Sequence, residues 1–169
     1  MGSLEYFKPE FHSLAKPNPM FWTAASNPYE VSKAIVQCRM LSGRYRTELL
    51  ASHWSQNKHG YCLQMSCKST VETLAHILLY CPSYSDARSK LQSMWLRFPN
   101  LCVNHLVRSL LSGPPEPLLQ FLLDPSVHPD VISMKQKFGA EPLRIVFHLT
   151  RTWCYDIHRL RAKLLGRWP

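Results

Sequence analysis

Four residues near the middle of the chain have the types and the spacing of metal ligands: Cys62, Cys67, His76 and Cys81. Four residues separate the members of each pair. Structural zinc sites place four cysteine or histidine ligands in a tetrahedron, with paired ligands about two to five residues apart. Because four protein ligands leave no open position for water, the pattern predicts one structural Zn²⁺ ion, and thiolates favour zinc over magnesium or calcium.

The sequence alone leaves two other interpretations of these residues open. The cysteines can be ordinary buried apolar residues, with His76 a core histidine, and His53 or His59 can serve as a substitute ligand. The remaining cysteines are Cys38, Cys102 and Cys154. They fall at apolar helix positions, where a buried free thiol is the common outcome.

The predicted elements would position the two ligand pairs differently. Residues 53–69 are rich in polar and turn residues, so we expect a loop that can curl around an ion. Ser69 and Glu72 match a capping box, which predicts a helix running to about Cys81, where Pro82 stops it. Such a helix would hold the second ligand pair at a fixed separation.

Helical apolar spacing recurs through the rest of the chain and strand alternation is hard to find, so we predict an all-α domain. Beyond the ligand pairs, one helix is expected to begin at about residue 83. The others are expected over residues 28–42, 101–112, 118–123, 129–138 and 141–165. Asn27 and Gly43 are expected to bound the helix over 28–42, and Ser83 with Asp86 to cap the one that begins at about residue 83. Burial is expected for Met94 and Phe138.

The chain divides into an arm and a domain. Residues 1–27 combine prolines with many aromatics, which predicts an extended arm that packs on this domain or on part of a larger protein. Residues 28–169 form the predicted helical domain, which contains the zinc knuckle at 62–81 and a basic C-terminal helix at 141–165.

Lysine and arginine outnumber aspartate and glutamate by 20 to 11, giving a net charge of +9 and a pI near 9.5. That balance favours polyanions, with nucleic acid ahead of an anionic membrane, although a solubilising surface charge has the same composition. Apolar runs long enough to span a membrane and a signal-peptide pattern are both lacking, so we expect an intracellular protein in the nucleus or cytoplasm. Six cysteines in a reducing compartment indicate metal or free thiols.

Two basic sets are candidate nucleic-acid contacts. They comprise Arg39, Arg44, Tyr45 and Arg46 before the ligands, and Arg144, Arg151, Tyr155, Arg159 and Lys163 on the last helix. Arginines interleaved with tyrosine suit a phosphate backbone with base stacking. A solvated helix face or a membrane-surface helix would carry similar residues.

Catalytic patterns are weak in this chain. Cys154 and His158 lie one helical turn apart, but Cys154 falls on the apolar side of its helix. The four aspartates are never adjacent, and neither a Gly-rich phosphate loop nor Gly-x-Ser-x-Gly is present. We therefore expect a protein that is not an enzyme.

Several stretches together resemble the C-terminal region of non-LTR (LINE-type) retrotransposon reverse transcriptases. They are Gln37–Tyr45, Trp54–Ser55, Gly60–Cys62, Cys67, Leu74–Leu78, Cys81–Pro82, Leu149–Tyr155 and Leu164–Trp168. The resemblance covers residues 5–168 and implies a Cys-Cys-His-Cys zinc knuckle that follows a polymerase thumb, although the first two cysteines are one residue further apart than in the family. Polymerase and endonuclease activities lie upstream of this region in such proteins.

The residues and the resemblance together predict a non-catalytic zinc module that holds an RNA template or target DNA. Its partners would be RNA or DNA and the polymerase portion of a parent protein. The alternative is a protein-interaction or structural module, or a domesticated remnant, that docks on a polymerase thumb or another partner.

Overall fold

The computed structural model describes residues 18–55, 59–67, 69–97 and 99–167, and this part of the chain confirms the all-α prediction. The α-helices are α1 (Pro19–Trp22), α2 (Pro28–Leu41), α3 (Glu48–Ser52), α4 (Ser85–Leu96), α5 (Leu101–Ser112), α6 (Pro115–Leu123), α7 (Pro129–Phe138) and α8 (Glu141–Leu164). A π-helical turn spans His76–Tyr80, and 3-10 turns span Met65–Cys67, Pro82–Tyr84 and Pro125–Val127. Extended pairing in the described residues is limited to one antiparallel bridge between Tyr61 and Val71.

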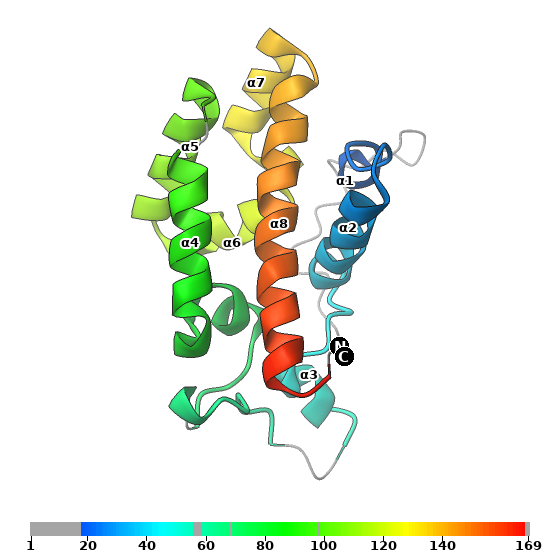
Figure 1. The fold of residues 1–169 in the computed structure, drawn as a ribbon, viewed down its shortest axis with the longest axis vertical. Coiled ribbons are helices and arrows are strands. Elements are labelled where there is room, and N and C mark those ends of the chain that lie inside the picture. Colours follow the sequence, from blue (N-terminus) through cyan, green and yellow to red (C-terminus); the bar gives the residue numbers. More distant parts are fainter. Residues whose placement is uncertain (1–17, 56–58, 68, 98, 168–169) are drawn as a thin grey trace.

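The last helix, α8, is the axis of the fold. It contacts α2, α4, α5, α6 and α7, and Figure 1 shows it standing between α4 and α2 along the long axis of the molecule. Its Trp153 packs on Trp95 of α4 with ring centroids 4.8 Å apart, and Trp95 makes an edge contact with Phe121 of α6. These fully buried rings form the centre of the core, because large aromatic side chains remove the most apolar surface from water.

One side of α8 is apolar and buried along most of its length. Leu143, Val146, Phe147, Cys154 and Ile157 are all buried, at the three- and four-residue spacing that places side chains on one side of a helix. The face ends before the helix does, since Leu164 is half exposed. Neither α8 nor another helix in the described residues combines the length and apolarity needed to cross a membrane.

Local capping signals in the sequence correctly placed two helix boundaries. The Asn27 side chain accepts a hydrogen bond from the Tyr29 amide at 2.9 Å, and Pro28 occupies the first turn of α2. After α7, Gly139 adopts a φ of 74°, a left-handed conformation that glycine reaches without the steric cost of a Cβ atom.

Two capping predictions are wrong. Thr73, rather than Ser69, caps the helical turn before Cys81, because its hydroxyl accepts the His76 amide at 3.0 Å. Ser69 itself has a positive φ of 66° in the preceding turn. Ser83 lies in a 3-10 turn, and α4 begins at Ser85 without a side-chain cap.

Burial of two apolar residues was also predicted wrongly. Met94 and Phe138 are 38% and 59% exposed, because each falls at the end of its helix, beyond the neighbouring helices. The described part of the N-terminal arm is a short helix, α1, rather than extended chain, and its Met20 is buried in the domain. Residues 1–17 of the predicted arm lie outside the described residues.

Candidate metal centre

The four predicted ligands come together in one buried cluster. The candidate ligand atoms of Cys62, Cys67, His76 and Cys81 all lie within 4.8 Å of one another, and all four residues are buried. The Sγ atoms of Cys67 and Cys81 are 3.4 Å apart. This separation is too long for a disulfide bond, so the cluster consists of free thiols and one imidazole that could hold a single metal ion.

A π-helical turn brings His76 and Cys81 to the same side of the chain. Residues five apart on an α-helix point about 140° away from each other, because each residue turns the helix by about 100°. Here the Cys81 amide instead donates to the His76 carbonyl at 2.7 Å, the bond pattern of a π-helix. Pro82 then keeps Cys81 extended, with ψ at 119°, so the turn ends at the ligand.

The other two ligands sit on a tight loop, as predicted. The Cys62 amide donates to the Thr70 carbonyl at 2.8 Å, and the Thr70 amide donates to the Cys67 carbonyl at 2.9 Å. A 3-10 turn ends at Cys67, whose amide donates to the Gln64 carbonyl. These backbone hydrogen bonds hold the main chain at both cysteines in place, and the two thiols point into the cluster. Residues 60–81 are called the metal loop below.

Two buried nitrogen atoms at the cluster have no hydrogen-bond partner among the described residues: Nε2 of His76 and Nη1 of Arg88. Burial lowers the pKa of His76, so the imidazole is neutral at pH 7 and can donate a lone pair to a metal. Burial also lowers the pKa of Arg88. The nearby Cys81 and Cys67 act in the opposite direction, because their charged forms raise that pKa. Buried polar groups are nearly always satisfied, so the unpaired Nε2 of His76 indicates a group that the described residues do not supply.

The thiols themselves are strongly affected by burial. Burial raises the pKa of Cys62 to about 12 and raises the pKa of Cys81 as well. Thiols in this setting stay protonated unless a cation replaces the proton, because a buried thiolate without a counter-charge is costly. A bound metal ion supplies that charge directly, so metal binding and thiol deprotonation would occur together.

A buried ion-pair network ties the metal loop to the helices. Glu72 is 1% exposed and binds the guanidinium of Arg161 on α8, and it also accepts the Glu48 amide at the start of α3 at 2.8 Å. Arg167 reaches Glu48 at 3.2 Å. Glu72, predicted to cap a helix, therefore links the metal loop to α3 and α8 instead.

The alternative ligands and thiols lie elsewhere. His53 and His59 are exposed and belong to no metal-ligand cluster in the described residues. Cys154 is buried as expected, Cys38 is half-buried, and Cys102 is exposed, contrary to the prediction of a buried thiol. The Cys154 thiol donates to the Leu122 carbonyl at 3.5 Å and burial raises its pKa, so it is not paired with a histidine as a nucleophile.

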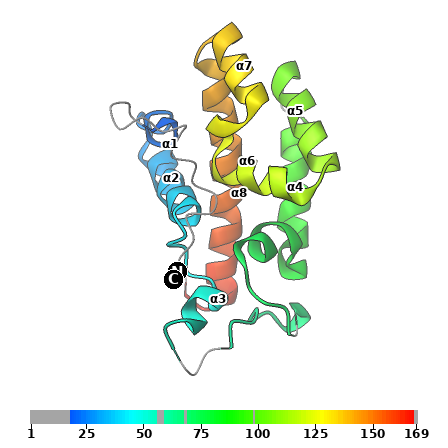
Figure 2. The ribbon, with the colours of Figure 1, turned by 180° about the vertical axis from the view of Figure 1, so that it is seen from behind.

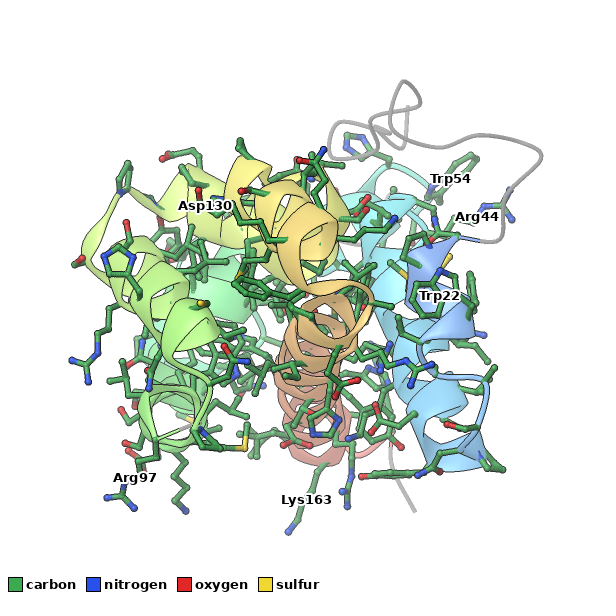
Figure 3. The ribbon with its side chains drawn as sticks, turned by 90° about the horizontal axis from the view of Figure 1, so that it is seen from above. Trp22, Arg44, Trp54, Arg97, Asp130 and Lys163 are labelled. Atoms are coloured by element: carbon green, nitrogen blue, oxygen red, sulfur yellow. The ribbon has the colours of Figure 1, made fainter. Side chains whose placement is uncertain are left out.

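Most of the predicted nucleic-acid contacts are on the surface. The exposed residues are Arg39, Arg44, Arg46, Arg144, Arg159 and Lys163. Tyr155 is half-buried, with its ring edge-on to Tyr29 and the Arg159 guanidinium above it. Figure 3 shows that Arg44 and Lys163 project from different sides of the molecule.

Two of the predicted contacts are wrong because the residues are interior. Arg151 is 1% exposed and donates two hydrogen bonds to the Glu30 carboxylate, together with bonds to Met20 and Thr23. Tyr45 is 7% exposed, and its hydroxyl contacts Nδ1 of His158 at 3.1 Å. Helical periodicity placed Arg151 outside, but it could not show that the N-terminal segment covers that side of α8.

Comparison with known proteins adds no relative to this description: no protein-family model, no curated protein and no solved structure matches the chain. The fold and the metal-ligand cluster therefore carry the functional argument by themselves.

Proposed function

We propose that this protein is a non-catalytic module in which one structural Zn²⁺ ion supports a nucleic-acid-binding surface. The observation that carries the proposal is the buried cluster of three thiols and one imidazole. Two sulfur ligands each about 2.3 Å from a tetrahedral zinc ion lie about 3.8 Å apart, close to the separation of Cys67 and Cys81. The donor set excludes the oxygen ligands that Mg²⁺ and Ca²⁺ require.

Four protein ligands complete a tetrahedron, so the zinc ion would have a structural role. The excess of cations supports a polyanion as partner, and six of the predicted basic residues are exposed. The resemblance to the C-terminal region of non-LTR retrotransposon reverse transcriptases points the same way. In that context the module would lie inside the cell, beside the polymerase portion of a parent protein, and help to hold the RNA template or target DNA.

The zinc proposal is tested by native mass spectrometry of the wild type, Cys67→Ser and Cys102→Ser. We expect one zinc ion per chain in the wild type and in Cys102→Ser, whose exposed thiol lies outside the cluster, and none in Cys67→Ser. A folded wild-type protein that binds no zinc after metal reconstitution would refute the proposal.

Nucleic-acid binding is tested by a salt titration with the zinc-loaded protein and labelled RNA and DNA. Contacts with phosphates release counterions, so the logarithm of the binding constant should fall linearly with the logarithm of salt concentration. Binding that does not depend on ionic strength would contradict a phosphate-contact mechanism.

A second candidate is a protein-interaction module that docks on a polymerase thumb or another partner. It is favoured by the exposed apolar side chains of the metal loop, where Leu63 is 56% and Met65 is 87% exposed. This candidate predicts self-association of the isolated chain and weak affinity for nucleic acid. Light scattering over a concentration series, with Met65→Ser as the comparison, distinguishes the two.

A further inference from the structure

Three segments build one end of the molecule around the metal loop. Figures 1 and 2 show α3, the metal loop and the C-terminal end of α8 at the same end of the long axis. The contacts agree, because a Cβ atom at Gly60 would lie 3.1 Å from Oγ of Ser52 in α3, and the Glu72 amide donates to the Gly60 carbonyl at 2.9 Å. These contacts hold the start of the metal loop against α3.

Two aromatic side chains are exposed on this surface. Trp54, two residues beyond the end of α3, is 84% exposed, whereas Trp95 and Trp153 are fully buried. Tyr61 is 47% exposed, and it occupies the one residue between Gly60 and the ligand Cys62. An indole left in water forgoes a large amount of hydrophobic stabilisation, so its exposure beside a metal-fixed loop indicates a contact surface.

In the described part of residues 31–85, the exposed charged side chains all have one sign. This stretch contains only two carboxylates, Glu48 and Glu72, and both are buried in ion pairs with arginines of the C-terminal segment. Arg44 and Arg46 are exposed in the same stretch. Figure 3 shows Arg44 and Trp54 projecting on the same side, with Arg97 on the opposite side. The partner that complements this surface is an anion with flat, stackable groups.

We propose that single-stranded nucleic acid binds at this end, with bases stacked on Trp54 and Tyr61 and phosphates against Arg44 and Arg46. This inference rests on the proposed nucleic-acid-binding function and names its substrate class and its surface. A single strand exposes the faces of its bases to aromatic side chains, whereas a duplex hides them within the stack. Phosphate charge matches the two exposed arginines.

The test is fluorescence anisotropy with the zinc-loaded full chain and labelled oligomers of roughly 12 nucleotides, a length within the usual range of single-strand sites. The probes are oligo-uridine RNA, oligo-thymidine DNA and a duplex of equal length, and the protein variants are Trp54→Ala, Arg44→Ala with Arg46→Ala, and Arg97→Ala. Comparison of the two single strands shows whether the 2′-hydroxyl matters.

We expect Trp54→Ala to weaken single-strand binding roughly tenfold, the loss typical of one stacked base, and to change duplex binding little. The double arginine variant should weaken binding and reduce the salt slope by about 1.4, or about 0.7 for each lost single-strand phosphate contact. Arg97→Ala removes an exposed charge from the opposite side, outside both predicted basic sets, and should have almost no effect. Because all four side chains are exposed in the folded chain, circular dichroism should show unchanged folding.

Failure of the inference is distinguishable from failure of the proposed function. Nucleic-acid binding that Trp54→Ala leaves intact, or a duplex bound as tightly as a single strand, would overturn this surface assignment while leaving a nucleic-acid module in place. A wild-type protein that binds none of the probes would overturn both. Trp54-dependent binding to anionic phospholipid vesicles in place of oligonucleotides would assign the surface to a membrane instead.

Discussion

At the scale of single residues, Arg88 is the least expected component of the metal centre. It extends from α4 to the cluster, where its buried Nη1 has no hydrogen-bond partner among the described residues. Three thiolates, one neutral imidazole and one Zn²⁺ ion carry a net charge of −1, which a neighbouring guanidinium would neutralise. An N–H donor also strengthens a thiolate ligand by fixing its orientation, as outer partners of zinc ligands generally do.

We therefore expect Arg88→Met to weaken zinc affinity by roughly 10- to 100-fold, the range typical of outer partners of zinc ligands. Competition with a chromogenic zinc chelator measures this affinity. Arg97→Met is the matched control, because Arg97 is an exposed cation at the other end of the same helix. Equal zinc affinity in the two variants would show that Arg88 does not act on the centre.

Residue types and spacing identified the four ligands but not Arg88. Ligand spacing is a local property, since Cys62 with Cys67 and His76 with Cys81 are each close in the chain. A lone arginine on a helix carries no such signal, because its role depends on which element the fold places beside it. The same limit explains Arg151, which has the sequence pattern of an outer-face residue and is buried by α1 and α2.

At the scale of elements, the sequence predicted the helices better than the contacts between them. The long helix α8 and the boundaries at Asn27 and Gly139 follow from apolar periodicity and capping chemistry within a few residues. The π-turn was not predictable, because an α-helix and a π-helix share composition and differ by one residue in the spacing of their hydrogen bonds. The turn places His76 and Cys81, which are five residues apart, in the same cluster.

The contact between α2 and α8 depends on a buried ion pair that is sensitive to acid. Glu30 binds Arg151 at 3.0 Å, Lys33 at 2.7 Å and His148 at 3.3 Å. Burial acts to raise the pKa of Glu30, but hydrogen bonds and charge from Lys33 and His148 outweigh it, and the net pKa lies below the ordinary value of 4.5. The folded state therefore binds this proton less readily than the unfolded state.

A lowered pKa means that Glu30 stabilises the folded protein above about pH 4.5 and that this contribution is lost as pH falls through the folded-state value. We expect Glu30→Gln to destabilise the protein at pH 7 by about 3 kcal/mol, since it leaves the buried Arg151 without a counter-charge. The variant should also lose less stability than the wild type when pH falls below 4.5. Urea denaturation between pH 3 and pH 7 measures both effects.

Glu141→Gln is the control for that experiment, because Glu141 is an exposed carboxylate on α8. Its free energy of unfolding should follow the wild type across the pH range. A Glu30→Gln profile that runs parallel to the wild type at acid pH would show that Glu30 titrates alike in both states.

At the scale of the whole molecule, the metal loop and the helical core have separate centres. The core centres on Trp95, Trp153 and Phe121, none of which is a candidate metal ligand. The loop is joined to the core by the fully buried Ile77 and Leu78, by the Glu72–Arg161 ion pair and by the hydrogen bond from Trp153 to the Leu78 carbonyl at 3.3 Å. The loop has little apolar interior of its own, so a metal ion would replace the core that a segment of this size cannot build.

Zinc removal should therefore open the metal loop and leave the helical core folded. We expect chelation to abolish amide protection over residues 60–81 and to retain it in α5, α6 and the middle of α8, as measured by hydrogen–deuterium exchange with mass spectrometry. Cys67→Ser without chelator should give the same pattern, which separates loss of the metal from other effects of the chelator. Global loss of protection would instead mean that the ion stabilises the entire fold through Glu72 and Leu78, and that the loop and the core form one cooperative unit.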